Sequence, residues 1–139
     1  MIVQVSAMSI LVVDDEPLVL ETLEMLLTFD GHRVEAASDG ESALKKFALQ
    51  DFDIVFTDQS MPKMSGEVLA MTIKKQSPEQ MVVMVTGSSA PQEDGEQPYI
   101  DFMLQKPFHL DDLREIVQKA ILKNAPKVPE SSSVMAALV

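Results

Sequence analysis

The chain alternates short apolar runs with longer segments of helical spacing. Apolar runs at residues 10–13, 54–56, 81–85 and, more weakly, 100–104 predict strands that are buried on both faces of a sheet. Residues 32–37 predict a further short strand. The alternation favours one α/β domain in which helices cover both faces of a parallel sheet.

Helical spacing fills most of the segments between these strands. Four leucines between residues 20 and 27 form one apolar face, and Pro17 stands in the first turn, where a helix tolerates proline best. Asp39 and Ser65 are expected to cap the next two helices at their amino ends. A last amphipathic helix is predicted from residue 110.

One segment, residues 88–98, does not fit this alternation. Pro91, Gly95 and Pro98 lie there among acidic and amide residues. Proline and glycine weaken helices, so we expect the fourth helix to be short or irregular, or replaced by an ordered loop.

Polar motifs directly follow four of the predicted strands. They are Asp14-Asp15-Glu16, Asp58, Thr86-Gly87 and Lys106-Pro107. The carboxyl ends of parallel strands meet at one edge of the sheet, and α/β sheets bind their ligands there. We therefore expect acids, a hydroxyl and an ammonium to lie close together.

The acids in these motifs predict a cation site. If Asp14, Asp15 and Asp58 converge, their like charges require a bound cation or proton uptake. Hard oxygen ligands without cysteine favour magnesium, with manganese as the alternative, over zinc. Magnesium usually takes further ligands from a substrate phosphate. Lys106 would supply a positive charge, and Thr86 a hydroxyl donor, for the phosphoryl oxygens. Asp58 follows an uncharged run and is the best candidate nucleophile.

Composition limits the remaining possibilities. With 139 residues the chain suits one domain, and a net charge of -11 disfavours nucleic-acid binding. It has no cysteine, no apolar stretch near the ~20 residues of a membrane span, and no basic start typical of a signal peptide. We expect a cytoplasmic protein without membrane insertion, with a domain at 9–123 between an extension (1–8) and a flexible tail or linker (124–139).

Residues 9–123 resemble the receiver domain of two-component response regulators. The resemblance is carried by residues 10–16, Asp58 with Met61-Pro62 and Ser65-Gly66, Val85-Thr86-Gly87, and Lys106-Pro107-Phe108. One pair alone is weak evidence, but together, in this order and spacing, the motifs are highly specific. The resemblance implies a flavodoxin-like, doubly wound five-stranded parallel sheet of order 2-1-3-4-5, with the site at its carboxyl edge.

The resemblance also implies a phosphoacceptor and a metal site. Asp58 would accept a phosphoryl group from the phosphohistidine of a histidine kinase or phosphotransfer protein. Asp15 and Asp58 would ligate magnesium directly, and Asp14 largely through water. The backbone carbonyl of Ser60 would complete the protein's share of ligands.

Other positions bear on the phosphoryl group. Thr86 and Lys106 would hold its oxygens, and the peptide bond after Lys106 is commonly cis in the family. Ser60 and Ser88 occupy positions that tune the lifetime of the phosphate. Met103 stands where family members often carry the Tyr or Phe of an aromatic switch.

The implied function is signalling rather than catalysis on a separate substrate. The protein would catalyse only its own phosphorylation and dephosphorylation, and would switch conformation. A kinase, a partner or a domain attached after Asn124 would detect the change. Segment 88–98 departs from the family pattern in the region that usually forms the output and dimer face. We expect a monomer or weak dimer.

Three alternative functions remain open from the sequence. A hydrolase of the haloacid dehalogenase type requires a second acid two residues after its nucleophile, and Ser60 occupies that position here. A flavodoxin-like cofactor binder needs a phosphate-cradling loop after the first strand, and the acids at 14–16 would repel phosphate there. A docking module that is not phosphorylated would not need Asp58 and Lys106.

Simpler structural roles exist for individual residues. Asp14 and Asp15 could cap the first helix, where acids contribute ~0.3–1 kcal/mol each, and Thr86 could belong to a turn. The site interpretation depends on all the motifs together. Neither His32, expected on a loop surface, nor His109, expected at a helix start, has ligand partners at useful spacing.

Overall fold

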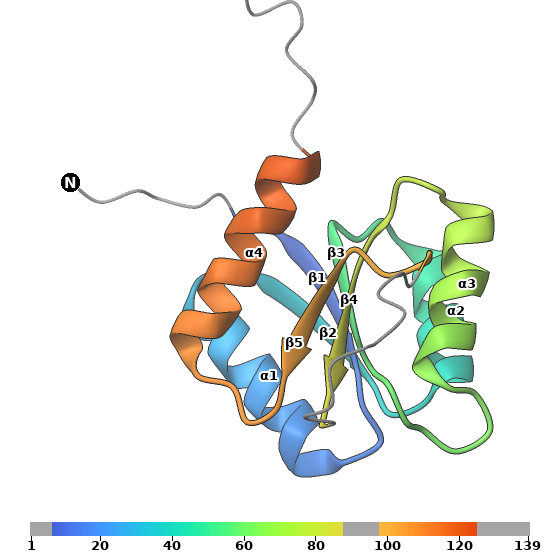
Figure 1. Ribbon diagram of the computed structural model, residues 1–139, viewed down its shortest axis with the longest axis horizontal. Helices are drawn as coiled ribbons and strands as arrows, with labels where there is room; N and C mark the ends of the chain where they lie inside the picture. Colours follow the sequence, from blue (N-terminus) through green and yellow to red (C-terminus); the bar gives the residue numbers. More distant parts are fainter. Residues whose placement is uncertain (1–6, 88–97, 125–139) are drawn as a thin grey trace, which may run out of the picture.

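The computed structural model describes residues 7–87 and 98–124, which form a sheet with helices on both sides (Figure 1). The strands are β1 (Ser9–Val13), β2 (Arg33–Ala37), β3 (Ile54–Asp58), β4 (Met81–Thr86) and β5 (Phe102–Gln105). The helices are α1 (Pro17–Phe29), α2 (Gly40–Leu49), α3 (Gly66–Gln76) and α4 (Leu110–Asn124). Among the described residues, no helix combines the length and the apolar character that crossing a membrane requires.

The sheet has the order that the resemblance implied. Five parallel strands run β2-β1-β3-β4-β5, so β1, β3 and β4 are central and nearly all of their residues are buried. The register pairs Asp58 with Val85, and Thr86 with Gln105. As a result, the residues that follow these strands emerge at the same edge.

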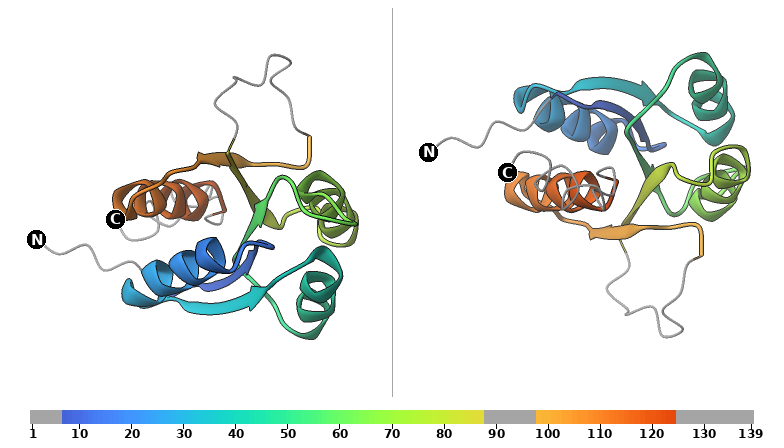
Figure 2. Two further views of the ribbon diagram at one scale, coloured as in Figure 1. Left: turned by 90° about the horizontal axis from the view of Figure 1, so that it is seen from below. Right: turned by 90° about the horizontal axis from the view of Figure 1, so that it is seen from above.

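Helices cover the two faces in pairs. Figure 2 shows α1 and α4 on one face and α2 and α3 on the other. Successive side chains of a strand point to opposite faces. Ile10 and Val12 therefore pack into the core beneath α1 and α4, whereas Leu11 and Val13 join the core beneath α2 and α3.

The predicted helix caps are present. The Asp39 side chain accepts a hydrogen bond from Ser42 N at 2.7 Å, and Ser65 Oγ accepts one from Val68 N at 3.2 Å. Gly31 has a φ of +92°, a conformation that favours glycine, and turns the chain after α1. These local patterns predicted the helix starts correctly.

One local prediction was wrong. His32 is 6% exposed rather than on a loop surface, and its Nδ1 accepts a hydrogen bond from Met8 N at 3.0 Å. The reason is tertiary, because the chain entering β1 lies beside the start of β2, where Arg33 N donates to Met8 O at 2.8 Å.

Some predictions fall beyond the described residues or shift slightly. β2 begins at Arg33 rather than 32. β5 spans Phe102–Gln105 rather than 100–104, and Gln105 lies opposite Thr86 on β4. A short or irregular helix was expected between β4 and β5, but residues 88–97 lie outside the described part of the chain. The tail was expected at 124–139; Asn124 instead ends α4, and residues 125–139 are outside the described part.

Candidate functional site

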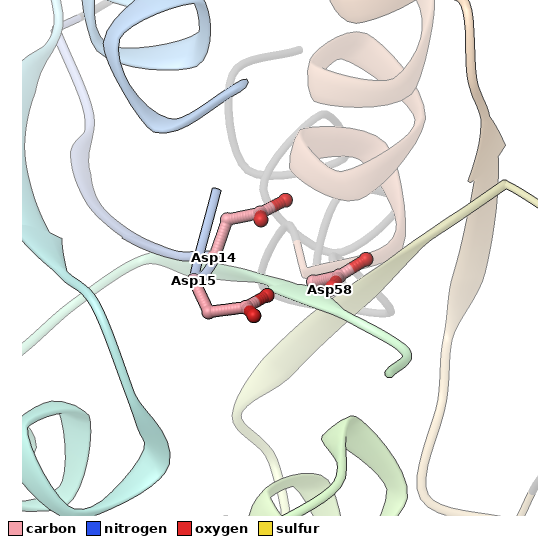
Figure 3. A group of neighbouring side chains, drawn as sticks. All are labelled: Asp14, Asp15 and Asp58. Atoms are coloured by element: carbon pink, nitrogen blue, oxygen red, sulfur yellow. The ribbon is translucent and has the colours of Figure 1, made fainter. Parts of the chain in front are cut away.

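Three carboxylates meet at the carboxyl edge of the sheet (Figure 3). Asp14 and Asp15 directly follow β1, and Asp58 is the last residue of β3, the neighbouring strand. One carboxylate oxygen from each residue lies within 4.8 Å of the other two. The structure thus brings the three acids together as the strand-end pattern predicted.

Asp14 is the most deeply buried of the three acids. It is 0% exposed, whereas Asp15 is exposed. Its Oδ1 accepts a hydrogen bond from Glu16 N at 2.9 Å, which fixes the turn into α1. Its Oδ2 receives no hydrogen bond from the described residues, although Lys106 Nζ lies 3.4 Å away as a charge partner. A role at the start of α1 therefore accounts for only one oxygen.

Lys106 brings a positive charge to the acids. Its Nζ lies 3.1 Å from Asp58 Oδ1 and 3.7 Å from Glu16 Oε1. Its backbone N donates to Thr86 O at 2.8 Å, which ties the end of β5 to the end of β4. The peptide bond after Lys106 is cis, as the resemblance implied.

Burial and the neighbouring acids shift the pKa values of the cluster. Burial raises the pKa of Asp14, and the Asp58 carboxylate adds to the rise. Burial also raises the pKa of Asp58, and Asp15 contributes, although Lys106 opposes both shifts. Burial disfavours the Lys106 ammonium, yet Asp58 and Asp14 outweigh it and raise the pKa of Lys106.

This donor set fits a hard divalent cation such as Mg²⁺. The converging groups are all carboxylates, the ligand type that Mg²⁺ prefers. Asp14 Oδ2 is a buried oxygen without a hydrogen-bond donor among the described residues. Lys106 alone leaves the pKa values of Asp14 and Asp58 raised, so a further positive charge would stabilise the ionised cluster.

The loop after Asp58 depends on a glycine. Gly66 N donates to Gln59 O at 2.9 Å, which closes the loop onto the start of α3. A Cβ at Gly66 would collide with the backbone oxygen of Asp58. Within the loop Lys63 has a φ of +71°, and Ser60 is exposed. The close approach of Gly66 therefore holds the acceptor end of β3 against α3.

Thr86 and Gln59 form a contact that the sequence did not indicate. Thr86 is 6% exposed, and its Oγ1 donates to Gln59 Oε1 at 2.6 Å. A glutamine after a strand has no distinctive sequence signal, so Gln59 was missed. Met103 lies on β5 opposite Met84 and is half-buried, while Ser88 is outside the described residues.

The arrangement suits transfer of a phosphoryl group. Asp58 offers a carboxylate nucleophile, with an ammonium 3.1 Å from it. Thr86, which carries a hydroxyl, is the last residue of the adjacent strand β4. Positive charge and donors of this kind stabilise the charge that spreads over phosphoryl oxygens in the transition state.

Comparisons with known proteins identify a family that this chain matches. Residues 10–118 match the family described as response regulator receiver domain. The chain is 33% identical over 124 residues to the probable transcriptional regulator ycf27 of Guillardia theta, covering 88% of this chain and 48% of that protein. It is 31% identical to the autoinducer 1 sensor kinase/phosphatase LuxN of Vibrio campbellii, covering 84% and 14% respectively. The chain thus spans about half or less of these relatives.

Solved structures give the same picture. The response regulator TrrA of Thermotoga maritima, solved in complex with Mg²⁺-BeF, is similar with a TM-score of 0.75 and 36% identity, over 81% of this chain and 98% of that one. NtrX from Brucella abortus, in complex with ATP, has a TM-score of 0.81 and 30% identity, over 91% of this chain and 29% of that one.

Proposed function

The chain belongs to the response regulator receiver domain family, and from this premise we propose that Asp58 accepts a phosphoryl group in a two-component system. The donor is the phosphohistidine of a histidine kinase or phosphotransfer protein. One observation carries the proposal: Asp58 ends a central strand with Lys106 Nζ at 3.1 Å and carboxylate oxygens of Asp14 and Asp15 within 4.8 Å. A simple structural aspartate would not need these neighbours.

The proposed transfer exchanges one bond for another. An oxygen of Asp58 attacks phosphorus, and the phosphorus–nitrogen bond of phosphohistidine breaks as the phosphorus–oxygen bond forms. The imidazole leaves with the electron pair of the broken bond. Lys106 and Thr86 hold two of the phosphoryl oxygens through an ammonium and a hydroxyl hydrogen bond.

We assign Mg²⁺, with Mn²⁺ as the alternative, to Asp14, Asp15, Asp58 and the backbone carbonyl of Ser60. Asp15 and Asp58 would ligate it directly and Asp14 largely through water. The ion would supply positive charge to the carboxylates and the phosphoryl oxygens. The all-oxygen donor set supports this assignment, as does the similarity to TrrA, which was solved with Mg²⁺-BeF.

Phosphorylation would then act as a signal. It shifts the balance between two conformations, and a kinase, a partner or an attached domain responds. An attached domain is supported by relatives such as NtrX, of which this chain covers 29%. The protein turns over no substrate besides its own phosphoryl group. Ser60 and Ser88 tune the lifetime of that group, and Met103 provides no aromatic ring to accompany Thr86.

Acetyl phosphate with Mg²⁺ tests the proposal directly. Intact-mass spectrometry of the wild-type protein should show the addition of one phosphoryl group, and Asp58→Asn should show none. Asp51→Asn, which makes the same chemical change at an exposed residue, should be phosphorylated like the wild type. Omitting Mg²⁺ should abolish the modification.

A negative result would be equally clear. If saturating acetyl phosphate leaves the wild-type mass unchanged, and beryllofluoride with Mg²⁺ shifts no NMR signal near Asp58, then Asp58 is not a phosphoacceptor. The chain would then be a docking module with a receiver fold. If Asp51→Asn also lost the modification, the effect could not be assigned to Asp58.

A further inference from the structure

A chain of side-chain hydrogen bonds links the end of β4 to the first turn of α3. Thr86 Oγ1 donates to Gln59 Oε1 at 2.6 Å, and Gln59 Nε2 donates to Glu67 Oε2 at 3.3 Å. Gln59 directly follows Asp58, the proposed phosphoacceptor. The chain therefore connects a residue proposed to hold phosphoryl oxygens with a helix that is not part of the acidic cluster.

Chemistry determines which way round the Gln59 amide lies. The carboxylate of Glu67 can only accept hydrogen bonds, so the Gln59 nitrogen must face it. The carbonyl oxygen of the Gln59 amide then faces Thr86, and a carbonyl oxygen can only accept a hydrogen bond. The Thr86 hydroxyl is consequently the donor in its bond to Gln59.

A hydroxyl has one proton to donate. In the unphosphorylated protein Thr86 Oγ1 donates this proton to Gln59 Oε1. A phosphoryl oxygen on Asp58 is also only an acceptor, so Thr86 cannot serve both partners at once. Binding of Thr86 to the phosphoryl group must break its bond to Gln59.

The Gln59 backbone is held on two sides. Its N donates to Val85 O at 3.1 Å, and its O accepts from Gly66 N at 2.9 Å. These bonds fix the main chain between β4 and α3, so a change at Thr86 is taken up by the Gln59 side chain. That side chain is half-buried and already contacts Glu67 in the first turn of α3.

We propose that Gln59 is a positioning residue that competes with the phosphoryl group for the Thr86 hydroxyl, and so restrains Thr86 until Asp58 is phosphorylated. This inference rests on the proposed function. Release of Thr86 frees the Gln59 amide oxygen and alters the hydrogen bond from Gln59 to Glu67. Phosphorylation of Asp58 would in this way change a contact in the first turn of α3. This coupling between Thr86 and α3 does not need an aromatic side chain at position 103.

Beryllofluoride with Mg²⁺ serves as the probe of the phosphoryl state. Gln59→Met keeps the length of the side chain and removes the acceptor, so the bond from Thr86 to Gln59 no longer competes with the ligand. The loss of one neutral hydrogen bond predicts that beryllofluoride binds about two- to tenfold more tightly. Gln76→Met makes the same change at an exposed position of α3 and should bind like the wild type.

A double-mutant cycle separates competition from a general structural effect. Thr86→Val removes the hydroxyl and should weaken binding. In the Thr86→Val background, adding Gln59→Met should change the affinity by less than about twofold, because the competing bond is already absent. If Gln59→Met tightened binding equally in both backgrounds, Gln59 would act independently of Thr86 and the proposal would be overturned.

NMR of the wild-type protein gives a test that needs no variant to fold. Adding beryllofluoride should shift the side-chain amide signals of Gln59 and the backbone amide of Glu67, and leave the side-chain amide of Gln76 unchanged. If the probe binds and the Gln59 amide does not move, the inference fails while the proposed function stands. If the probe does not bind the wild type at all, both fail together.

Discussion

Replacing Asp101 with asparagine should destabilise the fold by about 2–3 kcal/mol at neutral pH. Asp101 precedes β5 at the edge of the sheet opposite to the acidic cluster. Its side chain is only 12% exposed, and it accepts hydrogen bonds from Lys74 Nζ at 2.7 Å, Val82 N at 2.8 Å and Lys123 Nζ at 3.0 Å. It thus joins α3, β4 and α4 around one carboxylate.

The magnitude follows from the exposure of each partner. Lys74 is 15% exposed, so losing its charge-assisted bond to Asp101 should cost about 1.5–3 kcal/mol. Lys123 is 52% exposed, and solvent screening limits its pair to at most about 1 kcal/mol. Lys74 Nζ and Val82 N share Asp101 Oδ2, so the single oxygen of asparagine can accept from both. What Lys74 loses is the negative charge of its partner, which leaves its nearly buried ammonium uncompensated.

The effect should depend on pH in a defined direction. Burial would raise the pKa of Asp101, but the bonds from Lys74, Val82 N and Lys123 outweigh it and lower the pKa below 3.8. A carboxyl whose pKa is lowered by folding stabilises the fold above its unfolded pKa, and the stabilisation is lost as the pH falls through the folded value. The difference between wild type and Asp101→Asn should therefore be constant from about pH 7 to 5 and shrink below about pH 4.

Urea denaturation at several pH values measures this difference. Lys123→Met should cost less than about 1 kcal/mol, and Asp51→Asn, at an exposed residue, should leave stability unchanged. The reasoning would be refuted if the free energy of unfolding of Asp101→Asn lay within about 0.5 kcal/mol of that of the wild type at pH 7. It would also be refuted if the difference between the two grew as the pH fell.

Two further predictions concern Gly66 and His32. Gly66→Ala should lower both the thermal stability and the affinity for beryllofluoride, because its Cβ would meet the backbone oxygen of Asp58. The control Gly40→Ala would place its Cβ against only the flexible Met64 side chain and should lower the stability less. Equal losses of stability in the two variants would contradict this prediction. Burial lowers the pKa of His32 below 6.5, so the contribution of His32 to stability should decrease as the pH falls from about 6.5 towards 5. An NMR titration that gave a His32 pKa above 6.5 would contradict this.

Local sequence determined the elements and their ends. Apolar runs predicted the strands, and the side chains of Asp39 and Ser65 cap helices as expected. These features depend on residues within a few positions of one another, because a cap bonds to an amide three residues away. Such patterns can be recognised before the tertiary structure is known.

The convergence of the acids was predictable for a different reason. Asp14 and Asp58 lie 44 positions apart, yet both follow apolar strands, and parallel strands bring their carboxyl ends to one edge. Lys106 follows from the same rule and contacts both residues. The topology therefore predicted where these side chains meet, and the family motifs suggested what each one does.

Only the tertiary structure decided the contacts that depend on register and packing. The bond between Met8 and His32, the bond of Thr86 to Gln59 and the pair of Asp101 with Lys74 join residues 24, 27 and 27 positions apart. A hydrogen bond tolerates only a few tenths of an ångström, and a shift of one residue in register turns a strand's side chains to the opposite face. The apolar pattern predicts which elements are neighbours, but polar contacts of this kind require the exact placement that the packed sheet and helices provide.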